Sequence, residues 1–569
     1  MRGHLSHVGL RHAAAGLLAR WMGLLVPHYG RSGSMDLDLQ LYPDAGGPSH
    51  YNQFAHYPLL LLSEGIVTSV LSPSRKAAHR LLALRNLRYV LGITGRDFKQ
   101  PHWSRGQRWG RTHSDWMIFF LQRSLGIIEA RSLGSPSFRG ELARVVKGSL
   151  EVTFRDFRSR FAPQLARGAR RFPGNHAAWW AALFHEAGRR WERPEWTRFG
   201  ERFFRTLVLP LQDADGFWPE GGGMVGLYGM VTAQAVSVYA GASGDPAARA
   251  ALGRFLGAYR RFTFPDMSAS CVADCRMMYH DHPALFLASE FLAFEQGARF
   301  CLESVRAGER WLRREPPRDN NAQTAAFFSI FVEAIHRTRP DAVHSLPRPR
   351  LETLARVEGP RWHGLLSTQL NAETESRWCL DNQNFVELWS PDCGLLVGGG
   401  SSKHSPLFSS IREVGGTRAY TPTRARIVRR GLHSAEAEYH LRGATVRVRL
   451  SLRGREAALA WRIDNARVPL EAAVILVLRE GDLLRLGSEL TVRVSSRKLL
   501  ELEIPKGWGS LNARGVEILP PADARFSWPI SAWNPYRQDA LGGPARARLS
   551  WRLSRRETVV RFRLPTSRA

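Results

Sequence analysis

Cysteine is scarce in this chain of 569 residues, and the few that occur are odd in number. A small, odd set excludes the disulfide framework that holds many secreted domains together, and it is compatible with a reducing compartment. The five cysteines are Cys271, Cys275, Cys301, Cys379 and Cys393.

Long apolar runs are lacking as well. No stretch of about 18 apolar residues occurs, so the sequence predicts no transmembrane segment. Arg20 interrupts the apolar N-terminal stretch, which also lacks a small-residue cleavage site, so no secretory signal is expected. We therefore expect a cytoplasmic protein, or a secreted or periplasmic one if a signal was trimmed from the sequence.

Lysine is rare too: only six of the 80 basic residues are lysines, and the rest are arginines. Acidic residues number 51. The net charge of +29 attracts polyanions. Arginine pairs through two hydrogen bonds with carboxylates, which suits uronic acids as well as phosphates. No zinc-finger, RNA-recognition or Walker motif occurs and the basic residues are scattered, so no nucleic-acid partner is predicted. An oligomeric state does not follow from the sequence.

Between about residues 55 and 340 the apolar residues recur every three or four positions, which is the period of an amphipathic helix. Successive helical hairpins stack as a solenoid or close into a ring, and the lack of a repeat consensus favours the ring. Breaks rich in proline and glycine separate helices that we predict at 176–191, 194–212, 228–242, 246–262, 284–313 and 321–338.

After about residue 385 the period changes to two, which predicts strands at 444–452, 490–496, 499–504 and 559–564. Recurrent turns between them favour an antiparallel β-sandwich. The chain is too long for one core, so we expect a multidomain protein, α then β. The prediction is an (α/α) incomplete toroid of helical hairpins as catalytic domain at 1–345, a linker and the start of the β-region at 346–390, and the sandwich at 391–569.

The segment 102–116 interleaves tryptophan with arginine and histidine. Indole rings stack on sugar rings and arginine binds carboxylates, so the segment suits a glycan-binding groove. Packing of the tryptophans in a core explains their presence equally well. The candidate substrate-binding residues are Trp103, Arg108, Trp109, His113 and Trp116.

Two further clusters lie at predicted helix starts. Asn175 and His176 open one helix, where an N-cap is the simpler role for Asn175 and a surface position for His176. The glycine-rich segment 213–231 leads into Tyr228, although such segments are usually turns and a lone tyrosine usually packs in a core.

Taken together, these clusters resemble the heparinase II/III-like and chondroitin/alginate lyase group of polysaccharide lyases, which pair an (α/α) toroid with a β-sandwich. The histidine that many members place in the loop around Asp215 is absent here, and Glu220 stands nearby. The resemblance is carried by Asn175-His176-Ala177-Ala178-Trp179-Trp180, Asp215-Gly216-Phe217-Trp218, Tyr228-Gly229 and Cys275-Arg276-Met277-Met278-Tyr279-His280.

This resemblance implies β-elimination within an acidic, uronic-acid-containing polysaccharide or oligosaccharide, with no cofactor required. The reaction must neutralise the C6 carboxylate, remove the C5 proton and protonate the departing O4. An amide or arginine suits the first task, a histidine or deprotonated tyrosine the second, and a tyrosine hydroxyl the third. The implied catalytic residues are Asn175, His176, Tyr228 and Arg276, with Trp218, Glu220, Tyr279 and His280 as further substrate-binding residues.

Three alternatives stay open. A glycoside hydrolase on the same toroid would use two acids, for which Asp215 and Glu220 are the nearest candidates. A non-catalytic protein that binds acidic glycans fits the charge equally. A structural divalent metal is compatible with Cys271, Cys275, His280 and His282, but their spacing matches no standard zinc site and the cysteines are simply explained by apolar packing.

Overall fold

The structure is a computed structural model, and it divides the chain into two compact units. The helical unit comprises Met1–Trp218, Leu227–Arg260 and Pro283–Arg348, and the β unit comprises Pro219–Gly226, Arg261–His282 and Pro349–Ala569. The residues described are 7–37, 47–68, 71–104, 107–160, 174–220, 223–272, 274–276, 283–314, 321–337, 343–349, 351–370, 379–398, 400–403, 405–416, 422–487, 490–504, 510–531, 533 and 545–565.

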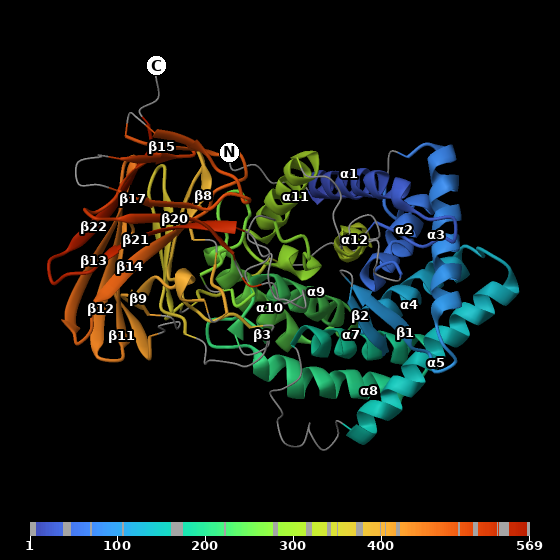
Figure 1. The fold of residues 1–569 in the computed structure, drawn as a ribbon. Helices are drawn as coiled ribbons and strands as arrows, with labels where there is room; N and C mark the ends of the chain where they lie inside the picture. Colours follow the sequence, from blue (N-terminus) through green and yellow to red (C-terminus); the bar gives the residue numbers. More distant parts are fainter. Residues whose placement is uncertain are drawn as a thin grey trace. The chain divides into compact units, whose positions relative to one another are not determined.

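The helical unit consists mainly of helices (Figure 1). None of its described helices is long and apolar enough to cross a membrane. They are α1 (His7–Leu25), α2 (His56–Ser63), α3 (Pro73–Ile93), α4 (Asp115–Ala130), α5 (Pro136–Arg160), α7 (Gly174–Arg190), α8 (Pro194–Phe203), α9 (Gly226–Ser243), α10 (Pro246–Tyr259), α11 (Gly297–Arg314) and α12 (Asn321–Arg337).

The helix predicted at 284–313 is correct only in its second part, since α11 begins at Gly297. Residues 284–288 are all buried, so no polar face shows there, although the apolar content suggested a helix. The backbone carbonyl of Leu287 accepts a hydrogen bond from Gln234 Nε2 (3.0 Å) instead of serving a helical ladder. A tertiary hydrogen bond therefore replaces local structure in this segment.

Five inner helices form a circuit of neighbours: α2, α4, α7, α9 and α12. α12 packs on α2, α2 on α4, and α4 on α7. The ring of His185 on α7 lies 5.4 Å from that of Tyr239 on α9. The circuit closes because Gln234 Nε2 donates to the backbone oxygen of Phe327 on α12 (2.8 Å). This closed arrangement of hairpins confirms the predicted toroid.

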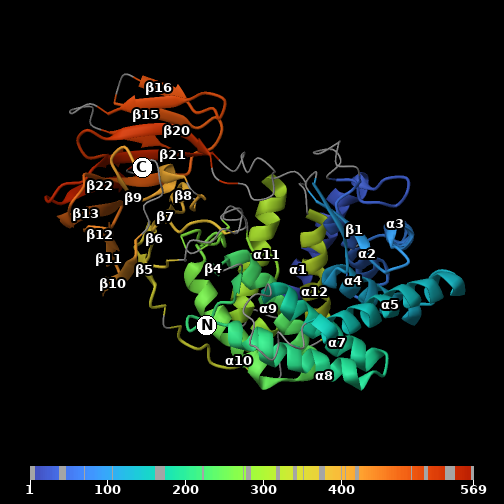
Figure 2. The ribbon, with the colours of Figure 1, turned by 60° about the horizontal axis from the view of Figure 1, so that its bottom comes forward.

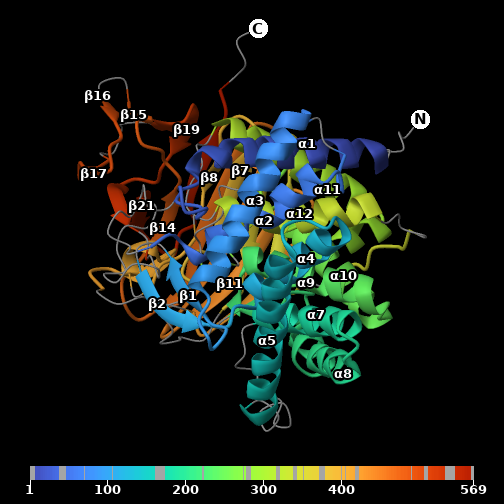
Figure 3. The same ribbon diagram turned by 90° about the vertical axis from the view of Figure 1, so that its right-hand side faces the viewer.

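The ring of Phe327 is the centre of the toroid. It contacts Phe120 of α4 and Trp179 of α7, with ring centroids 5.3 Å away in both cases. Outside the circuit, α3 packs on α2, α5 on α4 and α8 on α7, and Figure 3 shows α4 and α5 side by side. Each inner helix thus buries one face on the aromatic centre and another on its outer partner.

The inner helices run in the same direction. Trp116 on α4 stacks on His176 of α7, and three residues later Phe119 meets Trp179. Further along, Arg123 pairs with Glu186 and Glu129 with Arg190. The N-terminal ends of these helices therefore lie at one end of the toroid and their C-terminal ends at the other.

The β unit is an antiparallel sandwich, as predicted (Figure 2). One sheet has the order β10-β11-β12-β13-β22-β19-β18-β15-β16, and the other β17-β20-β21-β14-β8-β7-β6-β5 with β9 also paired to β14. Their inner faces share one apolar core. The strands are β5 (Leu354–Glu358), β6 (His363–Ser367), β7 (Val386–Ser390), β8 (Gly394–Val397), β9 (Ile411–Glu413), β10 (Arg424–Arg430), β11 (Ser434–Leu441), β12 (Ala444–Arg453), β13 (Glu456–Ala466), β14 (Leu470–Leu476), β15 (Leu483–Leu486), β16 (Leu490–Arg493), β17 (Leu500–Glu503), β18 (Leu511–Ala513), β19 (Val516–Leu519), β20 (Arg525–Ser531), β21 (Ala545–Arg552) and β22 (Thr558–Arg563).

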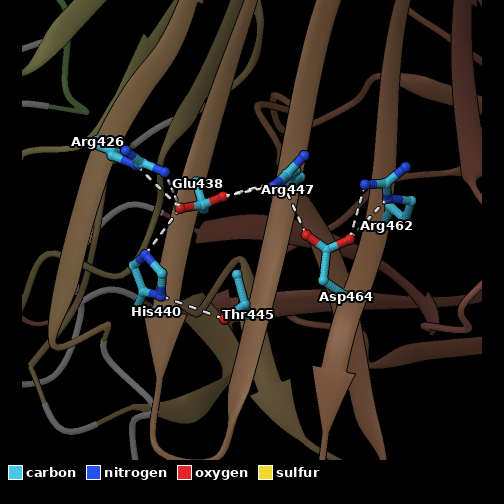
Figure 4. A network of polar contacts seen from close by, with 7 residues as sticks. All are labelled: Arg426, Glu438, His440, Thr445, Arg447, Arg462 and Asp464. Atoms are coloured by element: carbon cyan, nitrogen blue, oxygen red, sulfur yellow. Dashed lines mark hydrogen bonds and ion pairs between the residues drawn. The ribbon is translucent and has the colours of Figure 1, made fainter.

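Arginines on the outer face of the first sheet are paired across strands (Figure 4). Glu438 of β11 bonds to Arg426 of β10 and to Arg447 of β12, and Asp464 of β13 bonds to Arg447 and Arg462. Cross-strand pairs of opposite charge stabilise a sheet modestly. Part of the large arginine content of the sequence is therefore used to connect strands.

Candidate functional site

Three inner helices of the helical unit begin close to the predicted functional residues. Asp115 opens α4, Asn175 and His176 lie in the first turn of α7, and Tyr228 lies in the first turn of α9. The N-cap Ser114 accepts a hydrogen bond from the backbone of Met117 (3.2 Å), which sets where α4 starts. Helix N-termini carry partial positive charge, so this end of the toroid favours anions.

His176 and Asp115 form a hydrogen-bonded pair. Nδ1 of His176 lies 2.8 Å from Oδ2 of Asp115. The side chain of Asp115 is 4% exposed and that of His176 is 38% exposed. Such a carboxylate holds the Nδ1–H tautomer of the imidazole and leaves Nε2 with a lone pair. The pair thus presents a partly exposed imidazole beside a buried carboxylate.

Aromatic and histidine side chains surround this pair. Trp116 stacks on His176 with ring centroids 5.1 Å apart and is itself 6% exposed. Tyr51, in the turn His50–Phe54, contacts Trp116 and lies 2.9 Å through its hydroxyl from Nε2 of His102. We call the set the histidine rim; its residues are His50, Tyr51, His102, Trp109, Asp115, Trp116 and His176.

The other two histidines of the rim are neutral at neutral pH. Burial, reinforced by the neighbouring His176, lowers the pKa of His102 to about 4. Burial, together with the proximity of His102, lowers the pKa of His50 well below its usual range. His102 therefore serves as an uncharged hydrogen-bonding partner of Tyr51, whereas His176 combines a carboxylate partner with substantial exposure.

Most of the Trp-rich segment 102–116 lies in a hairpin of β1 (Gln100–Ser104) and β2 (Gln107–Thr112). Trp103 pairs with Arg108 across the two strands. Trp109 is 42% exposed and its ring lies 6.3 Å from that of His102, whereas Trp103 is only partly exposed. Arg108 is exposed, and His113, just after the hairpin, is half-buried. Trp109 offers a solvent-facing indole beside the rim, whereas Trp116 is largely a packing residue.

Asn175 does not cap its helix. Its side chain is wholly buried, and neither Oδ1 nor Nδ2 has a hydrogen-bond partner among the described residues. Buried amides are normally satisfied, so this one is energetically costly as it stands. The N-cap role that we favoured from the sequence is therefore wrong, because Asn175 lies inside the first turn of α7.

Tyr228 lies at the same end of the toroid as His176. Phe327 contacts both α7, through the ring of Trp179, and α9, through the side chain of Gln234, so Trp179 and Gln234 lie at the same height in the toroid. His185 and Tyr239 then meet further along, so α7 and α9 are parallel. Tyr228 precedes Gln234 by about 9 Å of helix, at ~1.5 Å per residue, and His176 precedes Trp179. The side chain of Tyr228 is partly exposed.

The remaining predicted residues divide between a core position, the β unit and the part of the chain that the structure does not describe. Trp218 is 1% exposed and donates its Nε1 hydrogen to the backbone oxygen of Val208 (3.0 Å), which is a core position. Glu220 and Arg276 belong to the β unit, where both are buried and Arg276 Nη2 lies 3.7 Å from Glu220 Oε1. Tyr279, His280 and His282 fall outside the described residues.

No metal centre forms among the residues that the structure describes, where no three His, Cys, Asp or Glu side chains are grouped to hold an ion. Cys271 and Cys275 are buried thiols, and burial raises the pKa of both well above the usual range, which disfavours the thiolate that binds metal. His280 and His282, the other two residues of that candidate, are not described.

Sequence reasoning missed Asp115, Tyr51, His102 and His50. Asp115 and His102 lie within the Trp-rich segment 102–116, and an acid in the first turn of a helix was the available signal. Tyr51 and His50 lie in a short 3-10 turn before α2, with no pattern to mark them. Their proximity to His176 follows only from the fold.

Comparison with known proteins gives similarities of structure only. No protein-family model matches the sequence, and no curated protein matches it. A solved structure of a chondroitin AC lyase mutant from Streptomyces coelicolor A3 is similar at 12% identity and a TM-score of 0.42, covering 98% of this chain and 80% of that one. The structure of the heparan sulfate lyase HepC of Pedobacter heparinus is similar at 12% identity and a TM-score of 0.43, covering 100% of this chain and 84% of that one. An unsaturated glucuronyl hydrolase specific for heparin is similar at 11% identity and a TM-score of 0.35, covering 58% of this chain and 99% of that one.

Proposed function

We propose that this protein is a carbohydrate-active lyase that cleaves an acidic, uronic-acid-containing glycan by β-elimination at the histidine rim. The observation that carries the proposal is the pair of His176 and Asp115, 2.8 Å apart, with half-exposed His176 stacked on Trp116. An imidazole held in place by a buried carboxylate is a group suited to removing a weakly acidic C–H proton.

The charge of the rim supports an acidic substrate. The starts of α4 and α7 meet there, and their partial positive charge favours a carboxylate or sulfate group. The single carboxylate of the rim, Asp115, is buried against His176 and does not face solvent. Exposed Arg108 on the adjacent hairpin adds a guanidinium suited to two-pronged contact with a carboxylate.

In the proposed mechanism Nε2 of His176 takes the C5 proton of the uronate, and Asp115 stabilises the imidazolium that forms. Electrons of the C5–H bond form the C4–C5 double bond while the C4–O4 bond breaks. Tyr228, which opens α9 at the same end, is the residue we assign to protonate the departing O4. Trp109 supplies a stacking surface for a neighbouring sugar.

Asn175 has the donor that would neutralise the C6 carboxylate, because its Nδ2 is unpartnered among the described residues. The side chain has no exposed surface in this structure. Substrate contact with Asn175 therefore requires neighbouring side chains to move aside, and His176 is the more direct test of the proposal.

The experiment is a panel of uronate polymers assayed for the ultraviolet absorbance of an unsaturated uronate and, in parallel, for new reducing ends. We expect both signals with at least one polymer. His176→Ala should lower the rate by about 10²–10⁴-fold, the usual cost of losing a general base. His336→Ala is the matched control, because His336 lies in the last turn of α12 and bonds to the backbone of Val332.

Reducing ends without the absorbance would replace the lyase by a hydrolase. Retention on an acidic-glycan column with neither signal would indicate a binding protein. Equal loss of activity in both histidine variants, or none in His176→Ala, would contradict the assignment of the base.

A further inference from the structure

A cavity of about 530 Å³ lies at the opposite end of the toroid from the histidine rim. Its walls come from the C-terminal halves of α4, α7 and α12, with Ile66 from the segment after α2. Gly126, Ile127 and Ala130 form an apolar side. Cavities of this size are in the range that holds small organic ligands. We call it the distal cavity.

Most of its charged residues are already engaged. Arg123 binds both Glu186 and Glu333, and Glu333 also accepts a hydrogen bond from Tyr57 and pairs with Arg337. Burial raises the pKa of Glu186, although the charge of Arg123 opposes that effect. These groups form a network of ion pairs that links α4, α7 and α12.

Two polar groups of the distal cavity are not engaged in this way. Gln122 is 4% exposed, and its Oε1 has no hydrogen-bond partner among the described residues. Arg131 is exposed, and its one recorded contact is a long hydrogen bond of 3.4 Å to the backbone oxygen of Glu64. An unpartnered buried amide oxygen calls for a donor, and a guanidinium without a carboxylate calls for an anion.

The charge of the lining agrees with an anionic ligand. Four arginines line the cavity, namely Arg123, Arg131, Arg190 and Arg337, against the two carboxylates of Glu186 and Glu333. Arg190 has its own partner in Glu129, outside the lining. The helix C-terminal ends carry partial negative charge that offsets some of this excess. The positive charge that remains in the distal cavity suits a ligand with a single carboxylate better than a polyanion.

We propose that the distal cavity binds a small hydroxy acid of the sugar-acid class, with a ligand hydroxyl hydrogen-bonded to the amide group of Gln122 and the ligand carboxylate held by Arg131. The apolar strip from Gly126 to Ala130 faces the ligand's carbon skeleton. This site is separate from the histidine rim, and it stands whether or not the rim catalyses β-elimination.

The test is isothermal titration of the full chain with D-glucuronate, with D-glucose and adipate as ligands that lack the carboxylate or the hydroxyls. We expect binding of D-glucuronate and at least tenfold weaker binding of the other two, since each lost charge-assisted or buried hydrogen bond costs about tenfold. Gln122→Leu and Arg131→Gln should each weaken D-glucuronate about tenfold. Arg139→Gln is the control, because among the described residues the side chain of Arg139 on α5 bonds only to the backbone oxygens of Ser132 and Gly134.

Gln122→Leu has a second readout, because removing an unpartnered buried oxygen should leave the apo protein as stable or more stable while affinity falls. Absence of binding at ~50 mM D-glucuronate would overturn the proposal. It would equally be overturned if Trp109→Ala with His176→Ala abolished binding while the two cavity variants bound normally, since the ligand would then occupy the rim.

Discussion

Glu387 of β7 should make the stability of the β unit fall as pH rises toward neutrality. Its side chain is wholly buried, where Oε2 accepts a hydrogen bond from Ser270 Oγ (2.6 Å) and Oε1 from the backbone of Cys271 (2.7 Å). Burial raises the pKa of Glu387 to about 7, although both hydrogen bonds act in the opposite direction. The residue connects β7 to the segment 261–282 of the same unit.

The sign follows from the order of the two pKa values. The folded-state pKa of about 7 lies above the ordinary value of 4.5, so between these values the folded protein holds a proton that the unfolded chain has released. The contribution of Glu387 to the free energy of unfolding is therefore highest below pH 4.5 and decreases until pH passes about 7. A difference of about 2.5 units at ~1.36 kcal/mol each amounts to about 3 kcal/mol.

The perturbation is Glu387→Gln, which carries no charge at any pH. Glutamine fits the same contacts, because Oε1 accepts from Cys271 and Nε2 donates to the Ser270 hydroxyl, which can turn to accept. Denaturant unfolding of both proteins between about pH 5 and pH 8, followed by fluorescence and circular dichroism, measures the difference in the free energy of unfolding. We expect the stability of the variant relative to the native protein to rise by about 2.5 kcal/mol between about pH 5 and pH 8.

Glu456 of β13 supplies a control of opposite sign. Its partial burial acts to raise its pKa, but hydrogen bonds from Arg563 and Arg561 outweigh burial and lower it. Glu456→Gln should therefore lose stability relative to the native protein as pH rises through the acidic range. A difference between Glu387→Gln and the native protein that stays constant from pH 5 to pH 8 would refute the reasoning about Glu387.

Three predictions concern the histidine rim and use a substrate identified by the panel. Asp115→Asn should lower kcat about 10–100-fold, because a hydrogen bond to a charged group contributes ~1.5–3 kcal/mol. An unchanged kcat and pH–rate profile would contradict the role of Asp115 as the partner of His176. Trp109→Ala should raise KM about 2–10-fold with kcat retained, as expected for lost aromatic stacking of ~0.5–1.5 kcal/mol; an unchanged KM would remove Trp109 from the binding surface. Tyr228→Phe should lower kcat about 10²–10⁴-fold with glycan binding retained, and full activity would show that another group protonates O4.

Much of the fold could be predicted because burial leaves a periodic pattern. The helix predicted at 176–191 is observed as α7 (Gly174–Arg190), and the strand at 444–452 as β12 (Ala444–Arg453). The pattern failed at 284–296, where residues 284–288 are all buried and show no polar face from which to read a period. It also failed at 100–112, where a short hairpin alternates polar and aromatic residues too briefly to distinguish it from a loop.

The membership of the two units was less predictable. Pro219–Gly226 and Arg261–His282 belong to the β unit although helices flank both in the chain. The second segment is held by Glu387 through Ser270 and Cys271, more than 100 residues away in the sequence. No local signal in either segment indicates such a partner, because the contact depends on how β7 is placed in its sheet.

By itself the sequence determined the helical and β regions, the excess of arginine, and the types of residue at the helix starts, because each of these depends on local order along the chain. Only the tertiary structure decided which of those residues meet. His176 finds Asp115 across 61 residues because α4 and α7 run parallel in the toroid, with their first turns at the same end. The same parallel arrangement places Arg123 between Glu186 and Glu333 at the other end, since parallel helices that share one end must share both.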